Sequence, residues 1–264
     1  MEHYRFWLEG LVLCSLVMAL VWFWQMRFGT PAVVDMVWSL ATSLLATSWI
    51  LLELSVVWER RWLLMLSVVL WGLRLSTHLA RRLWRDGHDG RYDAMSEAMG
   101  DRKQSGYFVF YQLQALGAFF CALSPYTALI GFREGLRLID WFALGLWLVA
   151  FVGVTIADNQ LSEFRRKAEN SGKVCNIGLW RYSRHPNYFF EWLIWISWAV
   201  MAIGGPMWWI STLCAMFMLV LLTRFTGIPH AEAQSLRSRG AAYEWYQQTT
   251  SPFIPWFPLI NQRP

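Results

Sequence analysis

The chain has 264 residues, of which 56% are hydrophobic and 17% aromatic, and it carries a formal net charge of +5. Apolar runs long enough to cross a bilayer make up most of it, which excludes a separate water-soluble domain and favours a helical membrane protein. Membrane topology and attraction to anionic lipid explain the excess positive charge, so nucleic acid is not an expected partner.

Seven apolar segments predict transmembrane helices in chain order. They cover residues 9–26, 33–57, 62–80, 107–131, 138–157, 188–204 and 206–223. The run Gly204-Gly205-Pro206 separates the last two and is typical of a tight turn between helices. The first segment lacks a small-residue cleavage site, so it is expected to be a helix and not a signal peptide. The predicted fold class is an all-α integral membrane protein, a seven-transmembrane-helix bundle that forms a single domain over residues 1–264.

The distribution of Lys and Arg predicts the orientation of the bundle. Of the 23 Lys and Arg residues, 17 fall in the connections and tail on the side of the C-terminus and five on the side of the N-terminus. Basic residues accumulate in cytoplasmic segments, so the N-terminus is expected outside and the C-terminus in the cytoplasm. The longer cytoplasmic loops are expected at about 81–106 and 158–187, and residues 229–248 predict an amphipathic helix lying on the cytoplasmic surface.

Several charged or polar side chains fall inside these apolar segments or at their edges. Such groups are costly in hydrocarbon unless they are paired or face a cavity. Asp35 begins the second predicted helix, and Arg74 and His78 lie four residues apart on one face of the third. Asp158 closes the fifth. All four fall in the cytoplasmic halves of their helices, which predicts one cytoplasm-facing polar pocket. The alternative is structural, with Arg74 paired to Asp35 and the other two in packing and capping roles.

The segment 178–192 reads G-L-W-R-Y-S-R-H-P-N-Y-F-F-E-W and leads from a basic, aromatic stretch into an apolar helix. Pro186 is tolerated in the first turn of that helix because no hydrogen bond is lost there. Asn187 and Glu191 are then four residues apart on one helix face. An amide and a carboxylate at the membrane edge, next to an arginine and a histidine, predict a site for a charged, polar ligand.

Metal and common nucleotide-binding motifs are missing from the sequence. The cysteines are scattered, with no pair at metal-ligand spacing, so neither a disulfide nor a metal site is expected. No G-x-G-x-x-G follows a strand and no P-loop occurs, so a dinucleotide site in this chain would not be a Rossmann site. Residues 81–92 read R-R-L-W-R-D-G-H-D-G-R-Y, an Arg-rich stretch whose two glycines allow tight turns suited to phosphate.

Three stretches carry a family resemblance: A-D-N-Q-L-S-E-F-R-R-K from residue 157, the motif of residues 178–192, and the closing T-S-P-F-I-P-W-F-P. The chain resembles the bacterial branch of the steroid 5α-reductase superfamily, and it is distantly similar to isoprenylcysteine carboxyl methyltransferases. The resemblance implies a seven-helix bundle in the bacterial cytoplasmic (inner) membrane, with an NADPH pocket that faces the cytoplasm. In this family the Asn-x-x-x-Glu pair, here Asn187 and Glu191, contacts the nicotinamide half of the cofactor.

The expected cofactor-binding residues follow from the same resemblance. They are Arg81, Asp158, Arg165, Lys173, Arg184, His185, Asn187, Tyr188, Glu191, Arg224 and Tyr246. The substrate side matches less closely. Steroid enzymes carry a Gln-Glu pair on the second helix, for which Asp35 is the nearest stand-in, and a tyrosine on the third, for which His78 is the nearest candidate.

The function implied is an NADPH-dependent membrane reductase of a C=C bond in a lipophilic, steroid-like or enone substrate that enters from the bilayer. Asp35, Arg74 and His78 are the expected catalytic residues, supplying a proton donor or a positive field at the substrate carbonyl oxygen. Membrane lipids are further expected partners, and the expected assembly is a monomer or a weak homo-oligomer.

Two alternatives stand beside the reductase. Membrane methyltransferases for isoprenylcysteine or phospholipid carry a closely similar R-H-P-x-Y motif that serves S-adenosylmethionine. They usually place a Glu-Glu pair before a Tyr-x-x-Tyr segment; here Tyr243 and Tyr246 keep that spacing, but residues 229–233 hold a single glutamate. The other alternative is a non-catalytic lipid-binding membrane protein.

Overall fold

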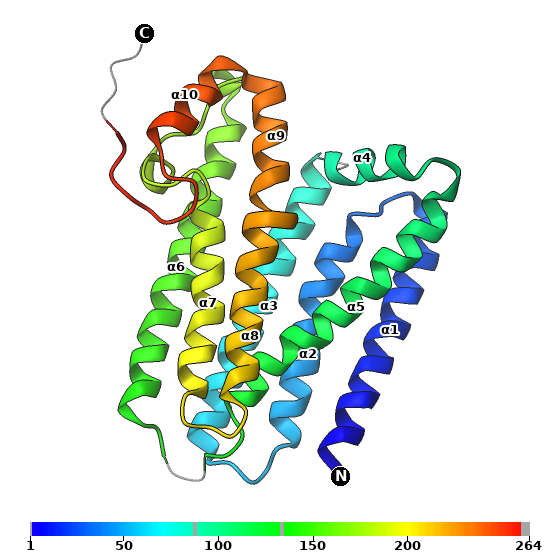
Figure 1. The fold of residues 1–264 in the computed structure, drawn as a ribbon, viewed down its shortest axis with the longest axis vertical. Helices are drawn as coiled ribbons and strands as arrows, with labels where there is room; N and C mark the ends of the chain where they lie inside the picture. The colour runs from blue at the N-terminus through cyan, green and yellow to red at the C-terminus, as the bar shows by residue number, and fades with distance from the viewer. Residues whose placement is uncertain (1, 87–88, 133–134, 260–264) are drawn as a thin grey trace. The chain divides into compact units, whose positions relative to one another are not determined.

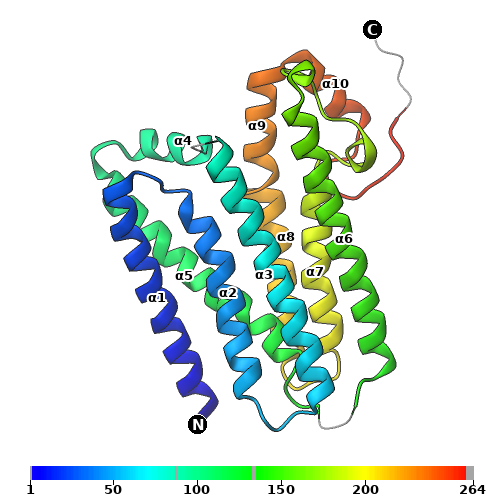
Figure 2. The same ribbon diagram turned by 180° about the vertical axis from the view of Figure 1, so that it is seen from behind.

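The computed structural model describes residues 2–86, 89–132 and 135–259, and its regular structure within them is helical (Figures 1 and 2). The chain divides into two compact units. The first comprises Met1–Leu136 with Ala202–Ser211, and the second comprises Arg137–Met201 with Thr212–Pro264.

The first unit is built on α1 (Glu2–Phe28), α2 (Val33–Leu52), α3 (Trp58–Asp86) and α5 (Lys103–Thr127), with a short α4 (Gly90–Met99) and a 3₁₀ turn η1 (Gly100–Arg102) before α5. In this unit α2 packs on α3, and α5 packs on α1 and α2 (Figure 1). A small residue allows the α2–α3 contact, since a Cβ on Gly72 would lie 2.3 Å from the Cβ of Ser43. The Ser43 hydroxyl donates to the Val68 carbonyl at 3.1 Å across the same contact.

The second unit contains α6 (Leu138–Arg166), the 3₁₀ turns η2 (Ala168–Asn170) and η3 (Gly178–Arg181), and most of α7 (Pro186–Ala202) and α8 (Trp208–Val220). A π-helical turn η4 (Leu221–Phe225) joins α8 to α9 (Ile228–Arg239), and α10 (Ala241–Thr249) follows. Figure 2 shows α6 and α7 side by side along this unit. Their close approach has a local cause, because a Cβ on Gly153 of α6 would lie 2.5 Å from the ring of Phe190 on α7.

Six helices in the described part of the chain are long and apolar enough to cross a membrane. They are Phe6–Phe28, Val33–Leu52, Trp58–Arg85, Gly90–Thr127, Leu138–Arg166 and Trp208–Arg239. The chain is therefore a helical membrane protein. The predicted sixth span corresponds to α7, which has 17 residues between Pro186 and the Gly204-Gly205-Pro206 turn. A seventh crossing and the orientation of the termini stay predictions.

The C-terminal surface helix predicted over 229–248 is wrong as a single element. Gly240 has φ +51°, which ends α9 and separates it from α10. In addition, α9 continues from α8 through η4 in one helical stretch (Figure 1). The segment is therefore one extension of the last span followed by a separate short helix.

Two other predicted boundaries also differ from the structure. The expected loops at 81–106 and 158–187 are largely helical at their starts, because α3 and α6 continue in polar sequence to Asp86 and Arg166. Conversely, α2 ends at Leu52 and not at residue 57. Glu53 leaves the helical conformation, at φ −82° and ψ +89°, and its carboxylate accepts from the Ser55 hydroxyl at 2.5 Å.

Candidate functional site

In the second unit, three candidate site residues, Asp158, Asn187 and Glu191, lie near one another at the end of α6 and the start of α7, the side that the charge distribution predicts to be cytoplasmic. The Asn187 side-chain amide donates to Asp158 Oδ1 at 3.1 Å, which joins the two helices. Asp158 is 8% exposed, and Glu191, one turn along α7 from Asn187, is 7% exposed. Two buried carboxylates and an amide thus lie on adjacent helices, as the shared helix face of Asn187 and Glu191 predicts.

The loop before α7 is placed by contacts to the end of α6. Gly178 has φ +53°, and a Cβ there would lie 2.3 Å from the Gln160 side-chain nitrogen, so glycine is required on both counts. Gln160 Oε1 accepts from the Leu179 backbone N–H at 2.9 Å, and the Trp180 indole N–H donates to the Ala157 carbonyl at 2.9 Å. These contacts hold the start of the R-Y-S-R-H-P motif against α6.

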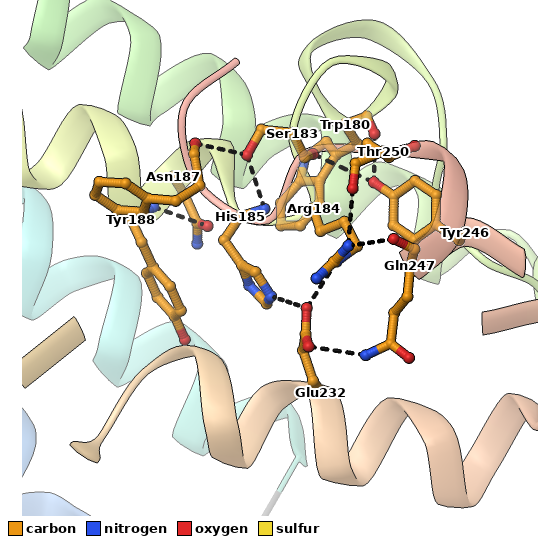
Figure 3. Close-up of polar contacts among 11 residues, drawn as sticks. Trp180, Ser183, Arg184, His185, Asn187, Tyr188, Glu232, Tyr246, Gln247 and Thr250 are labelled. Atoms are coloured by element: carbon orange, nitrogen blue, oxygen red, sulfur yellow. Dashed lines mark hydrogen bonds and ion pairs between the residues drawn. The ribbon is translucent and has the colours of Figure 1, made fainter. Parts of the chain in front are cut away.

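The arginine and histidine of the motif meet one glutamate from a distant part of the chain. Figure 3 shows Glu232 of α9 reaching toward both side chains. Arg184 Nε donates to Glu232 Oε1 at 2.7 Å, and His185 Nε2 lies 3.2 Å from the same oxygen. The Gln247 side-chain amide donates to Glu232 Oε2 at 2.8 Å. Arg184 is 9% exposed and the Glu232 side chain 16%, so this is a partly buried ion pair with a hydrogen-bonded histidine beside it.

Arg184 also ties the C-terminal segment to the motif. Its Nη1 donates to the Gln247 and Thr250 carbonyls at 2.7 and 2.8 Å, and its backbone N–H donates to the Ser251 carbonyl at 2.8 Å. The Tyr246 hydroxyl donates to the Trp180 carbonyl (Figure 3). Arg184 and Tyr246, both predicted to bind the cofactor, therefore make structural contacts with the protein itself.

The electrostatics around the motif favour a neutral histidine. Burial lowers the pKa of His185, although its hydrogen bond to Glu232 acts in the opposite direction. The imidazole stacks on the Tyr188 ring, with centroids 5.3 Å apart and planes 4° apart. Burial also raises the pKa of Tyr246, so its hydroxyl stays protonated and serves as a donor.

The basic residues predicted to contact phosphate are exposed. Arg165 lies near the end of α6, Lys173 lies in the connection after η2, and Arg224 lies on η4. The Lys173 carbonyl accepts from Arg239 Nε at 2.9 Å, which adds another cation next to Lys173. Arg239 was not predicted; only its position after the last helical span could have suggested it.

The predicted substrate-side residues and Arg81 belong to the first unit. Arg74, His78 and Arg81 lie on α3, and Arg81 is exposed. Asp35 accepts from Arg91 Nη2 at 2.6 Å and from the Tyr92 hydroxyl at 2.8 Å. Asp35 is therefore paired with Arg91 and Tyr92 of α4. The structural alternative from the sequence predicts Arg74 as its partner instead. Arg91 and Tyr92 belong to the D-G-R-Y run of residues 89–92. The sequence predicts a phosphate-binding turn there and does not predict a partner for Asp35.

Asp89, at the N-cap of α4, is expected to make the free energy of unfolding depend on pH in the acid range. It accepts hydrogen bonds from Arg91 and Arg82. Burial opposes its ionisation, but the hydrogen bonds and charges of these two arginines prevail and lower its pKa from 3.8 to about 2. A folded-state pKa below the unfolded value gives stability that is present above pH 3.8 and is lost as the pH falls through 2.

Asp89→Asn is therefore expected to lower the free energy of unfolding by about 2 kcal/mol at neutral pH, and this difference should largely disappear near pH 2. Denaturant unfolding of the detergent-purified wild type and variant across that pH range measures it. Asp93→Asn, on the exposed side of the same helix, is the control. A difference that stays constant with pH would contradict the role given to the Asp89 charge.

The described residues contain no group of three or more His, Cys, Asp or Glu side chains placed to hold a metal ion. The family of the chain follows from a match over residues 21–250 to the family described as "Protein of unknown function (DUF1295)". The chain belongs to the DUF1295 family. This is a steroid 5α-reductase-like family, which agrees with the resemblance carried by the three sequence stretches.

One curated protein to which the chain is similar is an uncharacterised protein of Schizosaccharomyces pombe, 25% identical over 213 residues. The alignment covers 71% of this chain, and the chain spans 62% of the yeast protein's length. No solved structure matches the chain. The matched range, residues 21–250, contains all four residues of the Asp158–Asn187 and Arg184–Glu232 contacts.

Proposed function

We propose that the protein is an NADPH-dependent membrane reductase that reduces a C=C bond in a lipophilic substrate of the steroid or enone class. The observation that carries the proposal is the partly buried Asp158–Asn187 contact, one turn from the buried Glu191. Carboxylates and an amide suit the ribose hydroxyls and the carboxamide of a nicotinamide nucleotide. The exposed Arg165 and Lys173 of the same unit suit its phosphates.

The donor and acceptor set fits such a cofactor better than it fits an apolar ligand. When bound, NADPH supplies a hydride. Asn187 and Glu191 would hold the carboxamide, so that one face of the nicotinamide is presented to the substrate. Two further members of the predicted set in the same unit, Tyr188 and Arg224, would contribute to binding the remainder of the nucleotide.

On the substrate side, side chains of α3 would polarise the carbonyl group of the substrate. Arg74 and His78 lie one turn apart on that helix, and a cation or an N–H donor there would stabilise negative charge on a carbonyl oxygen. Asp35 is a hydrogen-bond acceptor for Arg91 and Tyr92. We therefore propose that Asp35 positions Arg91 and Tyr92, and we no longer assign it the proton-donor role expected from the sequence.

Methyl transfer from S-adenosylmethionine is the second candidate, because one observation favours it. The single glutamate of residues 229–233, Glu232, reaches the Arg-His pair of the R-H-P-x-Y motif at 2.7 and 3.2 Å. A glutamate after the last span therefore contacts this motif, although the second glutamate of the methyltransferase pattern is missing. The Asp158–Asn187 contact has no part in that pattern and favours the reductase.

Calorimetric titration of the detergent-purified protein with NADPH, NADH and S-adenosylmethionine tests the proposal. The expected result is saturable NADPH binding that is lost in Asn187→Ala, with no competition from S-adenosylmethionine. The matched control is Asn159→Ala, an exposed amide next to Asp158 on α6. Saturable binding of S-adenosylmethionine without NADPH binding would replace the reductase with the methyltransferase.

A further inference from the structure

A cavity of about 230 Å³ opens in the first unit where α2 and α5 end. It lies among the connections that follow predicted spans, and hence at a membrane edge. Its lining residues are Trp7, Glu53, Ser55, Tyr126, Ile130, Gly131, Pro206 and Met207. None of the residues assigned to the proposed reductase takes part in it.

Two chain segments are in close contact at the rim of this cavity. Gly131 has φ +88°, a conformation that favours glycine, and a Cβ there would lie 2.3 Å from Pro206 Cδ. The connection after α5 and the turn before α8 are therefore in direct contact at the mouth. At about 230 Å³ the cavity is smaller than the roughly 300–1,000 Å³ typical of pockets for drug-sized ligands, so it suits a small group.

The charge of the cavity is negative. Glu53 is the only ionisable acid or base among the lining residues apart from the Tyr126 phenol. Its carboxylate accepts from the Ser55 hydroxyl at 2.5 Å and from the Tyr126 hydroxyl at 3.4 Å, which orients it. The nearby Arg60 guanidinium is directed elsewhere, since it donates to the Ala128 carbonyl at 2.8 Å and lies over the Phe132 ring.

Aromatic rings complete the site. Trp7 and Tyr126 both line the cavity together with Glu53. A carboxylate beside tryptophan and tyrosine rings attracts an ammonium group by charge and by cation–π interaction. The remaining lining residues are mostly apolar and suit the alkyl carbons that such a group carries.

We propose that this cavity binds the ammonium group of a small primary or quaternary amine at the membrane edge. Glu53 supplies the counter-charge, and the Trp7 and Tyr126 rings contact the cation. The amine is either the headgroup of a zwitterionic lipid or a free amine, because both present the same chemistry to the cavity.

The test uses full-length protein in detergent, with ethanolamine and choline as soluble probes in ligand-observed NMR titrations. Glu53→Gln keeps the hydrogen-bond acceptor but removes the charge, and it is expected to weaken binding of both probes about tenfold. Trp7→Leu keeps the charge and removes one ring, and it should weaken choline binding more than ethanolamine binding. Glu59→Gln, an exposed glutamate at the start of α3 outside the cavity, should bind like the wild type.

Native mass spectrometry with equal amounts of phosphatidylethanolamine and phosphatidylglycerol identifies the source of the amine. Selective retention of phosphatidylethanolamine by the wild type but not by Glu53→Gln supports the lipid headgroup. Binding of the soluble probes without lipid selectivity supports a free amine. The proposal is overturned if the folded wild type, checked by thermal unfolding, binds neither class, or if Glu53→Gln binds both as the wild type does.

Discussion

Replacing Glu191 with glutamine is expected to weaken NADPH binding about tenfold to a hundredfold, because a hydrogen bond to a charged group contributes about 1.5–3 kcal/mol. Glu191 is buried on α7, one turn beyond the Asn187 amide that contacts Asp158. Glutamine keeps the size of the side chain, so the change removes the charge and not the packing. Calorimetric titration with NADPH measures the affinity, and NADPH oxidation with a conjugated steroid enone measures turnover.

Glu163→Gln is the matched control for that experiment. Glu163 lies on α6 five residues after Asp158, but its side chain is exposed. The control should bind NADPH with wild-type affinity, and both variants should elute as monodisperse protein with similar thermal stability. Wild-type affinity and turnover in Glu191→Gln would remove this residue from the proposed cofactor site.

Replacing Arg184 with methionine is expected to lower the free energy of unfolding by about 2–3 kcal/mol, since it removes a charge-assisted hydrogen bond to a partly buried carboxylate together with two hydrogen bonds to backbone carbonyls. Glu232 loses its ion-pair partner and keeps its contacts with His185 and Gln247, and the carbonyls of Gln247 and Thr250 lose their donor. Unfolding of the detergent-purified protein measures the loss. Hydrogen exchange should also increase over residues 249–259, the segment that Arg184 holds.

Two further variants separate the causes. Arg181→Met changes an exposed arginine three residues earlier and should cost little. The double variant Arg184→Met with Glu232→Met removes both charges and should regain part of the lost stability. If Arg184→Met unfolds like the wild type, the partly buried pair contributes nothing to holding the C-terminal segment.

Much of the fold was predictable because the signals are local. Apolar runs predicted the helices that became α1, α2, α3, α5, α6 and α8, and the run from Pro186 predicted α7. The boundaries failed where polar residues continue a helix, as at Asp86 and Arg166, or where a single conformation ends one, as at Gly240. A hydropathy pattern detects the membrane-buried part of a helix and carries no information on how far the helix extends into polar surroundings.

Part of the candidate site was predictable for the same reason. Asn187 and Glu191 share a helix face by spacing alone, and Asp158 is a carboxylate at the end of the fifth predicted helix, to which the family resemblance assigns a cofactor-binding role. The contact that joins Asn187 to Asp158 spans 29 residues of sequence, and the role of both in binding a cofactor stays a prediction. The grouping of the second-unit residues with Arg74 and His78 in one pocket stays a prediction.

By itself, the sequence determined the helical membrane class and the motif at the start of α7, since both depend on residues close together in the chain. It also determined the DUF1295 membership, through a match over residues 21–250. Only the tertiary structure decided the pairing of charges. Arg184 meets Glu232 across 48 residues, and Asp35 meets Arg91 across 56. In a protein with many arginines, spacing alone does not select one partner; the packing of the helices brings one carboxylate within hydrogen-bond distance and partly buries the pair.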